Sequence, residues 1–176
     1  MYHLAMVITA DIYKPELWTN FFLLVGTGAA TLTGLVFVAM SLNLKVIAQD
    51  ATHRYRAIGT LTGLAADFLR CTIVLMGGQG HKSVGLELLT VSFLASIVYV
   101  NGYIKASKIA RGASLLRTTS GTTLYLIEMI GAIILISGSI GGLYIAAIAL
   151  VVNTCYMISG AWLLLMGVHQ TTTNKN

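Results

Sequence analysis

The segment from Leu17 to Leu44 constrains this chain more than any other feature. Its sequence, LWTNFFLLVGTGAATLTGLVFVAMSLNL, contains no charged residue. Because a helix needs roughly 20 apolar residues to cross a hydrocarbon core, this segment is long enough to span a bilayer with some tilt. Small residues recur in it at every fourth position, at Gly26, Ala30 and Gly34. In lipid such a seam lets helix backbones approach closely. We therefore expect this segment to be the central packing helix.

The composition supports the same class of protein. Of the 176 residues, 56% are hydrophobic and 10% are charged, and the mean hydropathy is +0.82. Soluble domains carry about 25% charged residues. We therefore expect an integral membrane protein with one transmembrane domain at residues 17–168, preceded by a short interfacial segment at 1–16 and followed by a polar tail at 169–176. A chain of this length leaves no room for a separate cytosolic catalytic module.

Four more apolar segments follow the first one. They lie at about residues 55–76, 84–104, 119–137 and 143–168. Each is long enough to cross a bilayer. The sequence thus predicts an all-α, polytopic helical bundle with about five transmembrane helices. The main alternative treats residues 119–168 as one helical hairpin that does not fully cross.

The basic residues are concentrated in alternate connections. The connections after the first and third segments, together with the tail, contain Lys45, Arg54, Arg56, Lys105, Lys108, Arg111, Arg117 and Lys175. The opposite side holds only Lys14 and Lys82. Because Lys and Arg favour the cytoplasmic side, we expect an outside N-terminus and a cytoplasmic C-terminus. The net charge of +5 is thus explained by orientation, and we do not expect a nucleic acid as partner.

Four ionisable residues lie within the apolar segments: Asp67, Arg70, Glu87 and Glu128. A charge at bilayer depth costs at least a few kcal/mol unless it is paired or hydrated. Asp67 and Arg70 are three residues apart, so they share one face of a helix. At about 1.5 Å per residue, Asp67 and Glu128 come near mid-membrane, and Arg70 comes near the level of Glu87. We therefore expect a cluster of one cation with up to three carboxylates.

Two interpretations of this cluster remain open. In the first, Arg70 neutralises Asp67 or Glu87 and holds the bundle in register. In the second, the carboxylates outnumber the cation, so that an unpaired one is protonated or reaches water, which suits a proton relay or a cation path. We favour the second for Glu128, which has no basic residue on its own helix. Glu87 can instead lie in the headgroup region.

Polar residues of the first segment allow two further interpretations. Thr27, Thr31, Thr33, Ser41 and Asn43 can line a pore, or they can form ordinary hydrogen bonds between helices, which we favour. The four histidines lie outside the apolar segments, and no zinc-type spacing or phosphate-binding glycine motif is present. We therefore expect no catalytic residues, no metal and no cofactor.

The sequences VGTGAATLTGLVFVAMSLNL (25–44), HRYRAIGTLTGL (53–64) and GLELL (85–89) resemble a family of small, multi-span prokaryotic membrane proteins of uncharacterised role. Its members have a first helix of the type LTGLxFVAxSLN. Some carry an automatic label as modulator of a membrane-anchored AAA protease. The likeness covers about the first hundred residues, and it implies a shared architecture and an accessory role but supplies no catalytic residues.

Two functional hypotheses follow. The first is a small, self-associating membrane protein that conducts ions or protons through its buried carboxylates. The second is a non-catalytic accessory or assembly subunit whose helices bind another membrane protein. Membrane lipids, further copies of the chain or a larger membrane protein are the expected partners. A lipid-modifying enzyme ranks third because no pair of nucleophile and base is evident.

Overall fold

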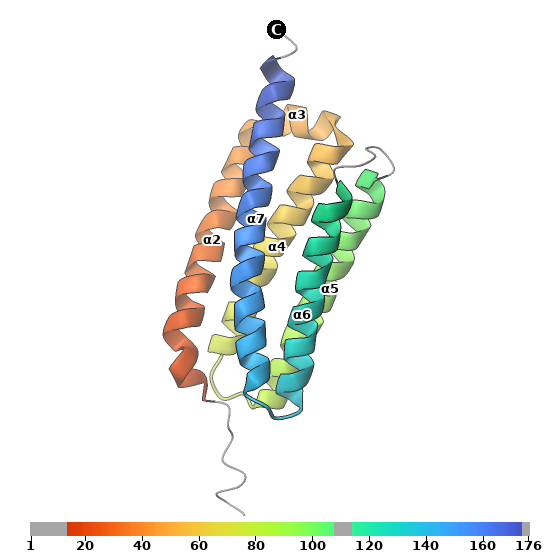
Figure 1. Ribbon diagram of the computed structural model, residues 1–176. Coiled ribbons are helices and arrows are strands. Elements are labelled where there is room, and N and C mark those ends of the chain that lie inside the picture. Colours follow the sequence, from red (N-terminus) through yellow and green to blue (C-terminus); the bar gives the residue numbers. More distant parts are fainter. Residues whose placement is uncertain (1–13, 108–113, 174–176) are drawn as a thin grey trace, which may run out of the picture.

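A computed structural model describes residues 14–107 and 114–173 of the chain. Within these residues a short 3-10 helix, η1, is followed by six α-helices (Figure 1). Their bounds are η1 Pro15–Trp18, α2 Thr19–Leu42, α3 Leu44–Gln49, α4 Ala51–Leu75, α5 His81–Ser107, α6 Ser114–Ile136 and α7 Gly141–Thr173. Most of the expected interfacial segment, residues 1–13, lies outside the described residues, as do Lys108, Arg111 and Lys175.

The predicted all-α class is confirmed, as are five helices long and apolar enough to cross a membrane. These candidate spans lie in α2, α4, α5, α6 and α7, at Glu16–Leu42, His53–Leu75, His81–Gly102, Thr119–Ile136 and Gly141–Met166. Two details differ from the prediction. The connection after the first span contains the short helix α3, and α7 continues to Thr173, so most of the expected polar tail is helical. No Gly or Pro follows Gly167 to end α7 earlier.

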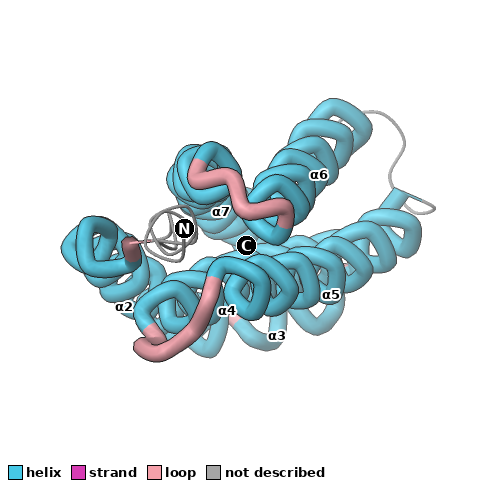
Figure 2. Tube along the Cα trace, turned by 90° about the horizontal axis from the view of Figure 1, so that it is seen from below, coloured by secondary structure: helices cyan, strands magenta, loops and turns pink. Residues whose placement is uncertain are grey.

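Four of the long helices form a closed bundle. α4 and α6 lie opposite each other, and each packs against both α5 and α7. α2 lies outside this bundle, where it packs mainly on α4 and less on α7. Figure 2 shows this arrangement from one end, with α4 and α5 in one layer, α6 and α7 in the other, and α2 beside them. The core of the bundle is therefore lined by α4–α7.

The prediction that the first long helix is the central one is wrong. Half of the residues in the most apolar stretch of α4 are buried, whereas 22% of those in the corresponding stretch of α2 are buried. Of the predicted seam, Gly26 is buried against Cys71 of α4, whereas Ala30 and Gly34 are exposed. A repeat of four residues drifts by about 40° per step around an α-helix, so Gly34 lies about 80° from Gly26. The stripe therefore turns away from α4 and does not form one continuous contact within the chain.

α6 and α7 approach each other closely beside the turn that joins them. A side chain at Gly142 would collide with the backbone N of Leu135 and the carbonyl oxygen of Gly131. The connection between these helices contains Gly138, whose φ of 90° is a conformation that only glycine adopts without strain. Glycines thus permit both the tight turn and the close packing that follows it.

The helices alternate in direction, so the connections gather at two ends (Figure 1). α3, the start of α4 and the last turn of α5 lie at the same end as the end of α7. That end carries Lys45, Arg54 and Lys105, whereas Lys14 and Lys82 lie at the other. The basic residues are therefore segregated along the bundle axis.

Candidate functional site: a buried charge network

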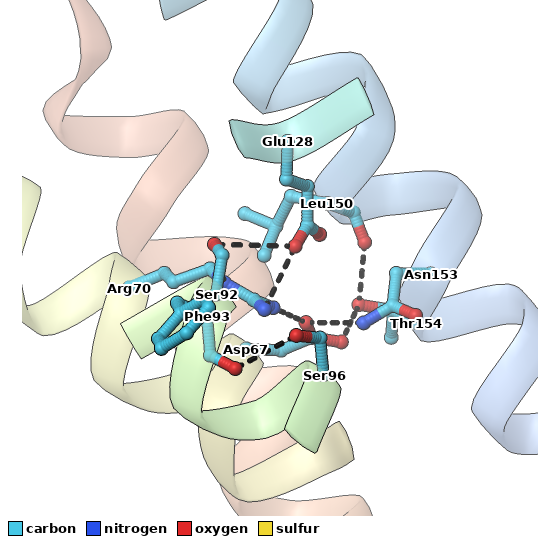
Figure 3. Close-up of polar contacts among 9 residues, drawn as sticks. All are labelled: Asp67, Arg70, Ser92, Phe93, Ser96, Glu128, Leu150, Asn153 and Thr154. Atoms are coloured by element: carbon cyan, nitrogen blue, oxygen red, sulfur yellow. Dashed lines mark hydrogen bonds and ion pairs between the residues drawn. The ribbon is translucent and has the colours of Figure 1, made fainter. Parts of the chain in front are cut away.

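Three of the four predicted ionisable residues meet in the core of the bundle. Asp67 and Arg70 lie on α4 and Glu128 lies on α6, and all three are at most 3% exposed. Nη1 of Arg70 is 2.7 Å from Oδ1 of Asp67, and Nη2 is 2.7 Å from Oε2 of Glu128 (Figure 3). One guanidinium therefore bridges two carboxylates that come from opposite helices.

Polar side chains of α5 and α7 complete the network. Asn153 donates a hydrogen bond from Nδ2 to Oδ1 of Asp67 at 2.8 Å. The hydroxyl of Thr154 lies 2.9 Å from Oδ2 of Asp67 and 3.0 Å from the carbonyl oxygen of Leu150. On the other side, Nε of Arg70 donates to the hydroxyl of Ser92 at 3.2 Å. Each helix of the four-helix bundle thus contributes to the network, and α2 contributes no hydrogen bond or ion pair to it among the described contacts.

The two carboxylates are held unequally. Both oxygens of Asp67 have short partners, on Arg70, Asn153 and Thr154. Glu128 uses only Oε2, which contacts Arg70 and, at 3.4 Å, the hydroxyl of Ser92. Its Oε1 is buried and has no hydrogen-bond partner among the described residues. Glu128 is therefore the less firmly held of the two carboxylates.

A small cavity adjoins this side of the network. It is lined by Phe22, Arg70, Leu88, Ser92, Glu128, Ala146 and Leu150. The space open to the centre of a water molecule is ≈ 10 Å³, which is about what a single water requires. The cavity therefore offers Glu128 a place where one small polar molecule fits.

An aromatic side chain of α6 packs against the same guanidinium. The ring centroid of Tyr125 lies 5.5 Å from Cζ of Arg70, which is within cation–π range. Its hydroxyl and Oδ1 of Asn153 are both buried at the edge of the network. Tyr125 thus covers the guanidinium on the side of the fully paired Asp67.

Glu87 is not part of the network, contrary to the prediction. Both of its carboxylate oxygens accept hydrogen bonds from Nε2 of Gln79, at 3.0 and 3.2 Å, beside the connection that leads into α5. Depth alone does not bring it to Arg70, because Glu87 lies about 140° around α5 from Ser92, the residue that faces the guanidinium. The cluster therefore has two carboxylates and one cation.

Four of the five polar residues named in the first span form hydrogen bonds within their own segment. Each side chain donates to a backbone carbonyl one turn earlier. Thr31 donates to the carbonyl of Thr27, Thr33 to that of Ala29, Ser41 to that of Phe37, and Asn43 to that of Ala39. These contacts give the four side chains local partners, and among the described contacts none of the four forms the expected hydrogen bond to another helix.

Sequence reasoning did not single out Ser92, Thr154 or Tyr125 as members of the network. Hydroxyls in apolar helices commonly bond to a carbonyl of the preceding turn, as Thr90 does on the same helix. No sequence signal distinguishes Ser92 from such residues. The only available indication is spacing, because Tyr125 lies three residues before Glu128 and so shares its helix face.

Among residues 14–107 and 114–173, no group of three or more His, Cys, Asp or Glu side chains is placed to hold a metal ion. The fold and the site thus define an all-α chain with five apolar helices and a charge network of two carboxylates and one guanidinium. Comparisons of the chain with protein-family models, with curated proteins and with solved structures found no match.

Proposed function

We propose that the chain is a multi-pass protein of a prokaryotic inner membrane, with its N-terminus outside and its C-terminus in the cytoplasm. The five apolar helices and their lengths support insertion. The segregation of Lys and Arg to the end of the bundle that carries α3 supports the orientation. The exposed leucine, isoleucine, valine and phenylalanine side chains of α2, α5 and α7 would then face lipid.

We further propose that the protein conducts protons, or ions coupled to protons, through the Asp67–Arg70–Glu128 network. The observation that carries this proposal is that two fully buried carboxylates share one guanidinium. With both carboxylates ionised the network has a net negative charge, which is costly at the centre of an apolar bundle. A proton or a cation must therefore neutralise this negative charge. A group that binds and releases a proton or a cation suits transport.

Glu128 is the member of the network that suits exchange. Its Oε1 has no hydrogen-bond partner in the part of the chain that the structure describes, and the adjoining cavity has room for one water. A proton on Oε1 would leave the contact of Oε2 with Arg70 intact. Asp67, by contrast, accepts three hydrogen bonds that protonation would weaken. Asp67 would therefore stay charged as the fixed partner of Arg70 while Glu128 changes state.

Proton flux into proteoliposomes tests this function. With a pH gradient and a membrane potential imposed, vesicles that contain the protein should acidify faster than empty vesicles. Glu128→Gln keeps the shape and removes the exchangeable group, so it should reduce the rate to that of empty vesicles. Glu87→Gln is the matched control, because Glu87 bonds to Gln79 outside the network, and it should retain the flux. Equal rates for the unmodified protein, Glu128→Gln and empty vesicles would remove the transport proposal.

A second candidate function is an accessory or assembly subunit that self-associates or binds a larger membrane protein. It is favoured by the exposed small residues of α2, since a Cβ added at Gly28 or Gly34 would meet no atom within 4 Å. A backbone surface of this kind permits close helix contacts in lipid. The family resemblance of residues 25–44 also supports an accessory role.

Cross-linking in native membranes tests the second candidate. Gly34→Cys in a variant without Cys71 and Cys155 should form a disulfide-linked dimer on mild oxidation if α2 joins two copies. Ile133→Cys on the exposed face of α6 is the control and should stay monomeric. A larger adduct that contains another membrane protein would favour the accessory role, and a monomer in both variants would contradict self-association through α2.

A further inference from the structure

Two cations from different helices converge on one aromatic ring at the basic end of the bundle. Tyr55 lies in the first turns of α4, next to Arg54, and Lys105 lies in the last turn of α5. Cζ of Arg54 is 5.4 Å from the ring centroid of Tyr55, and Nζ of Lys105 is 6.0 Å from it. Both basic side chains are exposed, and Tyr55 is half-buried between them. The three residues, called the Tyr55 site below, join two helices at one interface.

The charge around the Tyr55 site is one-sided. Residues 43–56, which connect α2 to the first turns of α4, contain Lys45, Arg54 and Arg56 but only one acidic residue, Asp50. The carboxylate of Asp50 accepts a hydrogen bond from the backbone N–H of His53 at 3.3 Å. Like charges that share one ring repel each other, and an anion placed between them would relieve this repulsion. The Tyr55 site is therefore complementary to a negative group.

An apolar surface continues from the Tyr55 site toward the middle of the bundle. Ile58, one turn beyond Arg54 on α4, is 44% exposed, and Val98, two turns before Lys105 on α5, is 40% exposed. The exposed amide of Asn101 lies one turn before Lys105, at about the depth of Ile58. α4 and α5 pack side by side along this surface. Cations at the end of the bundle, followed further in by an amide and aliphatic side chains, match the phosphate, ester groups and acyl chains of a phospholipid.

We propose that the Tyr55 site binds the headgroup of an anionic phospholipid whose acyl chains lie along Ile58 and Val98. Arg54 and Lys105 contact the phosphate, and the amide of Asn101 reaches the ester region. Basic residues at the cytoplasmic interface attract anionic lipid, and the convergence on Tyr55 concentrates this attraction at one position. The inference goes beyond the proposed transport function and depends only on the membrane placement of the helices.

Binding of phosphatidylglycerol to the purified full-length chain in mild detergent tests the proposal. The number and affinity of bound lipids are measured by native mass spectrometry. The variant Arg54→Gln/Lys105→Gln should lose about twentyfold in apparent affinity, because each basic residue near a surface contributes to binding of an anionic lipid. Lys14→Gln/Lys82→Gln removes the same charge from the other end and should change the affinity less than twofold. Phosphatidylcholine should bind more weakly than phosphatidylglycerol.

Three further measurements separate the possible sources of the effect. Arg54→Lys/Lys105→Arg keeps both charges and should retain the affinity, and the circular dichroism spectrum of Arg54→Gln/Lys105→Gln should match that of the unmodified protein, which would attribute its loss to charge. Inorganic phosphate at the concentration of the lipid should not compete, since the acyl chains are part of the interaction. Equal losses in the two glutamine pairs, equal binding of the two lipids, or full competition by phosphate would each overturn the proposal. Glu128→Gln should bind phosphatidylglycerol as the unmodified protein does, so a failure of the transport proposal is distinguishable from a failure of the lipid-binding proposal.

Discussion

At the scale of single residues, the molecule depends on the position of Arg70. Its guanidinium contacts Asp67, Ser92 and Glu128, which lie on three different helices. Removing one partner of a buried ion pair leaves an uncompensated charge, which costs far more than the pair itself contributes. The network is therefore more sensitive to loss of its cation than to loss of either acid.

Arg70→Gln should reduce the free energy of unfolding by about 3–5 kcal/mol, because it leaves Asp67 and Glu128 buried without their shared cation. The double variant Arg70→Gln/Glu128→Gln removes the cation together with one acid and should recover part of this loss. Unfolding of the purified protein by SDS in mixed micelles, followed by circular dichroism, measures both variants. An Arg70→Gln protein as stable as the parent would show that the ion pairs do not hold the bundle.

The sequence allows most of this network to be predicted, and the exceptions have simple causes. Asp67, Arg70 and Glu128 are recognisable because an ionisable residue inside an apolar segment needs a partner. Glu87 is also an ionisable residue inside an apolar segment, but it lies on a face of α5 that points away from the guanidinium. No sequence pattern identifies Ser92 as a member of the network, since its hydroxyl could equally bond to the backbone of its own helix. Depth along a helix can be counted from sequence, whereas rotation about the helix depends on packing.

At the scale of helices, an aromatic cluster connects η1 and the N-terminal end of the outer α2 to α7. The ring of Trp18 lies 4.6 Å from that of Tyr144 on α7 and 5.9 Å from that of Phe22, measured between centroids. Phe22 is 2% exposed and lines the cavity beside Glu128. The cluster thus links the attachment of α2 to the edge of the charge network.

Phe22→Ala should destabilise the protein by about 3–5 kcal/mol, the usual cost of truncating a buried phenylalanine, because it loses packing contacts and leaves a void. Phe37→Ala, on the same helix but 61% exposed, removes the same atoms without leaving a void and should have little effect. The midpoint of thermal unfolding in detergent compares the two variants. Equal shifts for both would mean that Phe22 is not a packing residue.

Gly142→Ala should separate α6 from α7, because the new Cβ would meet the backbone of Leu135 and Gly131. Overpacking of this kind typically costs about 1–3 kcal/mol. Gly34→Ala is the matched control, as no atom lies within 4 Å of its added Cβ, and it should leave the unfolding midpoint unchanged or slightly higher. A Gly142→Ala protein with an unchanged midpoint would contradict the close contact of the two helices.

The positions of the helices could be predicted from the sequence pattern, but their arrangement could not. The five apolar helices could be predicted to within a few residues, because length and hydrophobicity identify them. Their arrangement could not, since small residues indicate that a helix can be approached closely but do not indicate by which neighbour. Gly26 meets α4, whereas Ala30 and Gly34 of the same predicted seam are exposed. α4, which contains Asp67 and Arg70, is the central helix.

At the scale of the whole molecule, the alternating helices and the segregated basic residues predict a topology. In a variant without Cys71 and Cys155, cysteines at positions 14 and 82 should react in intact cells with a thiol reagent that does not cross membranes. Cysteines at positions 45 and 105 should react only after permeabilisation. If the cysteines at 14 and 82 and those at 45 and 105 all reacted from the same side of the membrane, the five-span arrangement would be contradicted.

Infrared spectroscopy tests most directly whether the buried network holds a proton on Glu128, as the proposed function requires. A protonated carboxylic acid has a carbonyl stretching band that an ionised carboxylate lacks. The membrane-reconstituted protein should show this band, shifted by exchange into D₂O, and Glu128→Gln should remove it while Glu87→Gln keeps it. A spectrum without the band at any pH at which the protein stays folded, or a band that persists in Glu128→Gln, would contradict the claim.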